Sequence, residues 1–222
     1  MKKLLILLVV LCPFAAKAQS AFNFDYDYAR FGYDSTSNYV EFYYSFAQSQ
    51  LKLVKKDAGF VVNAMLHIEI TDTARKVSVV KKDFNIVNPV TDTSKAGMSR
   101  SLVGVIGFIV PRGQYKSVVT GQDVADPAKK KEIVEHLKIE PLVRNTLAMS
   151  DIELASNIKQ ENTDSTSIFY KNTLEVQPNP TMIFGDGVPV LFHYAEVYNL
   201  AKDTVLRKEI KISTVLYNSK GN

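Results

Sequence analysis

Residues 60–71 alternate apolar and more polar side chains at every second position. The apolar positions are Phe60, Val62, Ala64, Leu66, Ile68 and Ile70. Successive side chains of a β-strand point to opposite faces, so this segment presents one continuous apolar face to a core. The other face is more polar from Asn63 onward, which is typical of an antiparallel sheet with one side in water.

The same two-residue period recurs along most of the chain. Val40, Phe42, Tyr44 and Phe46 repeat it over residues 39–47. Further strands are predicted over 22–31, 76–87, 101–110, 114–122, 167–176, 189–199 and 207–217. Many short strands at this spacing predict an all-β fold of the sandwich class. The length suits one large domain or two ordinary ones, and we expect two tandem antiparallel Ig-like β-sandwiches, residues 19–143 and 144–222.

Turn-forming residues separate these predicted strands. Asp186-Gly187 tolerates the positive φ angles of a tight hairpin, so residues 185–188 are expected to join two strands. The polar segment 91–99 predicts a loop. Asp126-Pro127 resembles a helix start, but 132–140 also alternates, and we favour a turn followed by a strand. Gly104 and Gly107, inside a predicted strand, indicate a β-bulge rather than a phosphate loop.

The first 18 residues have the organisation of a secretory signal peptide. Lys2 and Lys3 form a positive start, residues 4–14 are apolar, and Ala16-Lys17-Ala18 offers a small-x-small cleavage site. The apolar run is shorter than the ~20 residues that a membrane-spanning helix needs. We therefore expect export to the periplasm, the outer membrane or the medium, with no transmembrane segment in the mature chain.

Cleavage would also remove the sole cysteine and most of the net charge. Cys12 lies inside the leader, and Leu11 before it does not fit a lipoprotein site. Lys2, Lys3 and Lys17 account for three of the four net positive charges. A nearly neutral chain without cysteine gives no basis for nucleic-acid binding or for disulfides. Burial of apolar faces must therefore hold the mature protein together.

Sequence patterns of catalytic or metal sites do not stand out. His67, His136 and His193 have no companion at ligand spacing, and no H-E-x-x-H, C-x-x-C or G-x-S-x-G pattern occurs. A Ser-His-Asp triad can still assemble from distant residues. We expect a protein that is not an enzyme and that needs no cofactor.

Two residue pairs are candidates for ligand binding. Tyr39 and Tyr43 lie on the strand face opposite Val40 and could form a platform on which a sugar stacks. Asp25 and Asp27 share one face of the first predicted strand and are candidate calcium ligands. Both pairs are also explained as ordinary side chains on the face of a β-sheet, and we favour that structural interpretation over either ligand.

Five short motifs occur in a characteristic order. They are Val40-Glu-Phe-Tyr-Tyr44, Pro111-Arg-Gly-Gln-Tyr115, Leu147–Ala155, Val176–Pro180 and Tyr194–Tyr198. Together they resemble the β-rich N-terminal region of secreted GWxTD-domain proteins of Gram-negative bacteria, over residues 22–217. The resemblance implies an exported, two-part β-sandwich module and supplies no catalytic residues.

The G-W-x-T-D signature itself is absent, because the chain has no tryptophan. In the family this signature follows the β-rich region. Residues 218–222 also resemble a hairpin turn without a returning strand, which would leave an unpaired sheet edge. Both observations favour a chain that continues beyond Asn222, with an incomplete second domain.

We therefore expect an exported, non-enzymatic β-sandwich module that contacts protein partners in the cell envelope or outside the cell, through strand edges or end loops. The alternative is a glycan- or calcium-dependent ligand-binding module that uses Tyr39 and Tyr43 or Asp25 and Asp27. An enzyme is the third interpretation.

Overall fold

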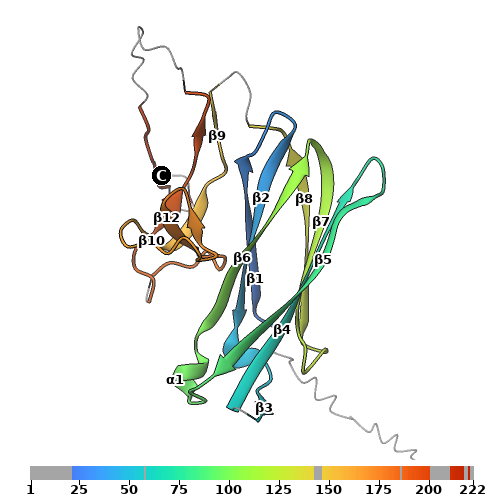
Figure 1. Ribbon diagram of the computed structural model, residues 1–222, viewed down its shortest axis with the longest axis vertical. Coiled ribbons are helices and arrows are strands. Elements are labelled where there is room, and N and C mark those ends of the chain that lie inside the picture. Colours follow the sequence, from blue (N-terminus) through green and yellow to red (C-terminus); the bar gives the residue numbers. More distant parts are fainter. Residues whose placement is uncertain are drawn as a thin grey trace, which may run out of the picture.

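The computed structural model describes residues 22–57, 59–142, 147–185, 187–200, 211–217 and 220. Fourteen β-strands dominate these residues, and all of their pairings are antiparallel (Figure 1). The predicted all-β class is confirmed. The expected leader, residues 1–18, lies outside the described residues, which hold no helix long and apolar enough to cross a bilayer.

Two sheets make up the first part of the chain. The smaller has the order β1-β2-β6 and consists of β1 (Phe24–Gly32), β2 (Ser37–Ala47) and β6 (Ser101–Pro111). The larger is built around β4 (Gly59–Asp72). It also contains β3 (Val54–Lys56), β5 (Ser78–Val90), β7 (Gly113–Asp123) and β8 (Lys130–Ile139). β5 pairs with one edge of β4, β3 and β7 share the other edge, and β8 follows β7.

The main hydrophobic core lies between these two sheets. The predicted apolar face of β4 is confirmed, since Val62, Ala64, Leu66, Ile68 and Ile70 are each at most 1 % exposed. Phe60 is the exception, being 38 % exposed at the second residue of the strand. Inward-facing residues of β1 and β2 complete the core from the other sheet: Phe24, Val40, Phe42 and Phe46.

The connections partly follow the sequence predictions. The predicted loop 91–99 instead contains a one-turn helix, α1 (Lys95–Met98), because the Ser94 side chain accepts a hydrogen bond from the Gly97 amide at 3.2 Å. A short 3₁₀ turn, η1 (Gln48–Gln50), follows β2. The turn at Asp126 is closed by the Lys129 amide at 2.9 Å, and a strand follows as predicted.

The second part of the chain forms smaller sheets. Its strands are β9 (Ala148–Met149), β10 (Glu153–Lys159), β11 (Tyr170–Lys171), β12 (Leu174–Pro178), β13 (Phe192–Tyr194) and β14 (Val197–Tyr198). Four of them form a sheet in the order β11-β12-β10-β13, and β14 pairs with β9. A second sheet facing these four strands is not seen in the described residues.

Four predictions in this part need correction. The predicted strand 189–199 is two short strands, β13 and β14. The predicted strand 167–176 is a hairpin, because positive φ angles at Asn172 and Thr173 reverse the chain between β11 and β12. The turn 185–188 closes a single isolated bridge between Gly185 and Val188 rather than a long hairpin. Residues 211–217 form no strand, and residues 207–210 of that prediction lie outside the described residues.

The two parts pack directly against each other. The outer face of β1 and β2 contributes Ala29, Phe31 and Tyr43 to a second buried cluster, and the small sheet contributes Ala155, Val176 and Tyr194. Figure 1 shows β10 and β12 beside the three-stranded sheet. The expected domain boundary at residues 143 and 144 lies in a stretch outside the described residues. Within the described residues, this second core is shared between the two parts.

Candidate functional site

A largely buried lysine joins the two parts of the chain. Lys171 on β11 extends to Glu41 on β2, and its Nζ lies 2.7 Å from Glu153 Oε2 on β10. The ammonium is also 5.0 to 5.5 Å from three aromatic ring centroids, those of Phe31, Tyr43 and Tyr194. Ring faces attract cations, so the site holds Lys171 by ion pairs and by aromatic contacts together.

Burial gives this cluster unusual protonation properties. Glu153 is fully buried, and burial raises its pKa to about 7 although Lys171 opposes the shift. Its Oε1 atom has no hydrogen-bond partner among the described residues. Tyr43 donates a hydrogen bond to Glu41 Oε2 at 2.7 Å, and burial raises the Tyr43 pKa well above its ordinary value. The centre thus has two carboxyl groups for one ammonium, and the raised pKa of Glu153 favours its protonated form.

A second polar network lies next to Lys171. The Glu196 carboxylate accepts hydrogen bonds from Asn172 Nδ2 at 2.7 Å, from Tyr194 Oη at 2.6 Å and from the Tyr198 hydroxyl. The Gly32 amide donates to Tyr198 Oη at 2.7 Å. These contacts fix the loops of the second part on the end of β1.

An open hollow of about 370 Å³ lies between the two parts, beside these networks. Its aromatic and charged lining comprises Phe31, Tyr33, Tyr39, Glu41, Lys171 and Glu196. Volumes of roughly 300–1,000 Å³ are usual for small-molecule sites. The hollow is therefore large enough for one small polar ligand.

The predicted platform of Tyr39 and Tyr43 is not an exposed pair. Tyr43 is 1 % exposed because the second part of the chain covers that face of β2, whereas Tyr39 is 36 % exposed and lines the hollow. The end of the Tyr39 ring lies over Gly107, where a Cβ would overlap it. The register of β6 on β2 is continuous, so the expected bulge is wrong. Gly107 instead leaves room for this ring.

The Asp25 and Asp27 pair is only partly exposed. Both side chains lie on one face of β1 as predicted, and burial raises the Asp27 pKa. Asp27 Oδ1 accepts a hydrogen bond from the Tyr28 amide at 2.8 Å. The described residues contain no cluster of three or more acidic, histidine or cysteine side chains suited to a metal.

The histidines occupy separate strands. His67 Nδ1 lies 2.6 Å from Asp83 Oδ1 on the neighbouring strand β5. His136 on β8 and His193 on β13 are exposed. The structure thus places the three histidines in different surroundings rather than in one site.

A second surface lies where the sandwich is open. Among the described strands, β5 pairs only with β4 and β6 only with β2, so each has a free edge. Phe84 of β5 and Phe108 of β6 contact each other with ring centroids 6.3 Å apart, and both are only partly buried. Ile86 and Ile106 beside them are also partly buried. The inner apolar side chains are therefore incompletely covered here.

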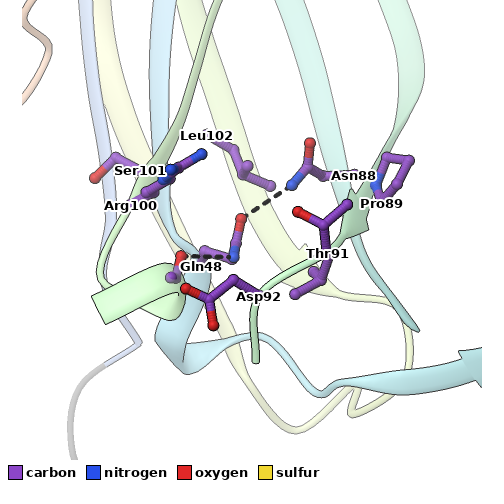
Figure 2. Close-up of a pocket in the computed structure, with 10 residues that line it drawn as sticks. Gln48, Asn88, Pro89, Thr91, Asp92, Arg100, Ser101 and Leu102 are labelled. Carbon is purple, nitrogen blue, oxygen red and sulfur yellow. Dashed lines mark hydrogen bonds between the residues drawn. The ribbon is translucent and has the colours of Figure 1, made fainter. Parts of the chain in front are cut away.

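Polar side chains close one end of this open side (Figure 2). Gln48 Oε1 accepts a hydrogen bond from Asn88 Nδ2 at 2.9 Å, and its Nε2 donates to Gly97 O at 3.3 Å. The pocket around them has a volume of about 250 Å³, and Asp92 and Arg100 also line it. Gln48 therefore links β5 to α1, the helical turn that precedes β6.

Sequence reasoning missed Glu41, Glu153 and Lys171. A signal existed for Glu41, since an acidic residue inside an aromatic strand needs a partner if it is buried. Nothing in the order of residues shows that Glu153 and Lys171 supply the rest of the centre.

Comparison with known proteins identifies no relative. No family model, no curated protein and no solved structure matches this chain.

Proposed function

We propose that this protein is an exported, non-enzymatic module that binds protein partners in the cell envelope. The partner would contribute an extended segment to the open side of the sandwich, between β5 and β6. The supporting observation is the pair of free strand edges with incompletely covered apolar side chains between them. Free edges offer unpaired backbone groups, and an added strand satisfies them while its alternate side chains enter the gap.

The two halves of β5 differ in how accessible their edge is. Lys81 and Lys82 lie in the first half, and lysine on an edge strand opposes pairing with another chain. Phe84, Ile86 and Val87 follow, and Val87 is 52 % exposed. A partner strand would therefore pair along residues 84–88. Pro89, which has no amide hydrogen to donate, would end the pairing.

The leader and the ordered motifs support the cellular part of the proposal. The charged start, apolar run and small-x-small site of residues 1–18 support export. The five ordered motifs support a relationship to the β-rich region of GWxTD-domain proteins. On this basis we propose an Ig-like sandwich followed by a second β domain. A G-W-x-T-D segment encoded downstream in the same frame would support the relationship.

Site-specific photo-crosslinking in envelope preparations tests the binding surface. A photoreactive residue at Ile86 should form adducts with a protein partner. The same residue at Val134, which is 46 % exposed on the edge strand β8, is the matched control and should not. Ile86→Lys should abolish binding of the purified partner, and Val134→Lys should retain it.

Hydrogen exchange distinguishes strand addition from a side-chain contact. Bound partner should slow exchange of amides within residues 84–88, because strand pairing occupies them. Equal adducts at both positions, or binding without this protection, would refute the proposed mode. Turnover by the purified protein in a hydrolase screen would refute the non-enzymatic assignment.

A further inference from the structure

We infer that the hollow between the two parts is a binding site for a neutral sugar unit of a glycan. The hollow lies against the outer face of β2, whereas the open side proposed for protein partners lies at the free edges of β5 and β6. The inference therefore stands apart from the proposed protein-binding function. It rests on the position of Tyr39, on the unfilled polar groups and on the balance of charge.

Tyr39 provides an aromatic surface that is held in place. The Tyr39 ring leans from β2 across to the neighbouring strand β6, where its end lies over Gly107. The ring keeps 36 % of its surface exposed at the hollow. Phe31 and Tyr33 line the same space. The negative face of an aromatic ring suits the C–H groups on one side of a pyranose.

The polar groups around the ring include unfilled acceptors and donors. Glu41 uses Oε2 for its contacts with Tyr43 and Lys171, and the described residues give Oε1 no partner. Lys171 contacts two carboxylates, so one of its three N–H groups remains for a ligand. A hydroxyl group both donates and accepts. Neighbouring hydroxyls of a sugar would therefore satisfy Glu41 and Lys171 together.

The charge of the lining disfavours other ligand classes. Glu41 and Glu196 outnumber Lys171 among the charged groups of the hollow, so an anionic ligand would meet net negative charge. An ammonium ligand could donate to a carboxylate, but it would lie beside the Lys171 ammonium and leave the third N–H group of Lys171 without an acceptor. A neutral ligand with several hydroxyls avoids both penalties.

Isothermal titration with defined trisaccharides tests the inference. Maltotriose, cellotriose and triacetylchitotriose are the neutral probes, and trigalacturonate and trilysine are the charged comparisons. At least one neutral probe should bind with a Kd of about 1 mM or tighter, and Tyr39→Ala should weaken it at least about tenfold. Tyr217→Ala, at a tyrosine 65 % exposed outside the hollow, is the matched control and should bind like the parent.

A second variant tests the position of the ring rather than its presence. Gly107→Ala keeps every polar group but displaces Tyr39, because the new Cβ would overlap its ring. It should weaken the same probe, while circular dichroism confirms that the fold is retained. Failure of all three neutral probes would overturn the inference. Binding that survives Tyr39→Ala, or binding of a charged probe alone, would overturn it as well.

Discussion

Replacing Lys171 by methionine would remove the cation that joins the two parts and leave its carboxylate partners unpaired. Methionine keeps a long apolar side chain in contact with the rings of Phe31 and Tyr43. The change therefore deletes the charge while it conserves most of the packing. Glu153 and Glu41 would then face each other across the buried centre without a cation.

The expected cost follows from the burial of the three charges. The side chains of Lys171, Glu41 and Glu153 are 13 %, 10 % and 0 % exposed. Removing one partner of a buried ion pair typically costs about 3–5 kcal/mol, because a charge remains buried without compensation. For a chain of this size that corresponds to a melting temperature about 6–20 °C lower.

Urea denaturation followed by far-ultraviolet circular dichroism measures this cost at pH 8. Lys159→Met is the matched control, since Lys159 pairs with Glu175 at 3.1 Å on the surface with 45 % of its side chain exposed. That change should cost at most about 1 kcal/mol. At pH 5 the deficit of Lys171→Met should shrink, because the unpaired Glu153 can bind a proton.

Equal losses of unfolding free energy in the two variants would refute this reasoning, because they would show that the buried centre contributes no more than a surface pair. A deficit of Lys171→Met that stayed constant between pH 8 and pH 5 would also refute it. That result would assign the loss to packing rather than to unpaired carboxylates.

Three further changes test other features of the structure. The Glu153 pKa of about 7 lies above its ordinary 4.5, so folding favours its protonated form, and the unfolding free energy should fall by up to about 3 kcal/mol as pH rises from 5 to 8. Melting curves of Glu153→Gln should lack most of this pH dependence. Gly104→Ala should cost about 1–3 kcal/mol in urea titrations, because its Cβ would overlap the Tyr44 ring, and Tyr44→Val in the same chain should recover part of the loss. Arg30→Lys should lower the unfolding free energy by about 1 kcal/mol in the same assay. The Arg30 guanidinium donates two hydrogen bonds to the Asp151 carboxylate, at 2.7 and 2.8 Å, and lysine cannot make both. The cost is small because both side chains are about one-third exposed.

Local sequence patterns were sufficient to predict the long strands of the first part, but not the short strand β3. The alternation over 60–71 depends on the two-residue period of a strand, which is a property of the backbone alone. It correctly placed the buried face of β4 from Val62 to Ile70. The same logic was less successful in the second part, where positive φ angles at Asn172 and Thr173 divide one predicted strand into a hairpin.

Local patterns could not predict the glycines or the buried charges. A glycine in a strand often marks a bulge, but Gly104 and Gly107 instead accommodate tyrosine rings from the neighbouring strand. Whether Tyr43 is exposed depends on residues more than one hundred positions away that cover the outer face of β2. Of the predicted tyrosine pair, Tyr39 lines the hollow, whereas Tyr43 is buried.

The sequence by itself determined the β class, the inward faces of β2 and β4 and the dependence on apolar burial, because these follow from local periodicity and from composition. The tertiary structure alone decided which outer faces are covered and which charges meet. Glu41, Glu153 and Lys171 lie far apart in the chain, and their protonation and pairing exist only after the second part packs on β1 and β2. Burial and contact with other charges set the electrostatic free energy of a charged group. Both depend on which segments pack together, so the centre and its hollow arise from packing.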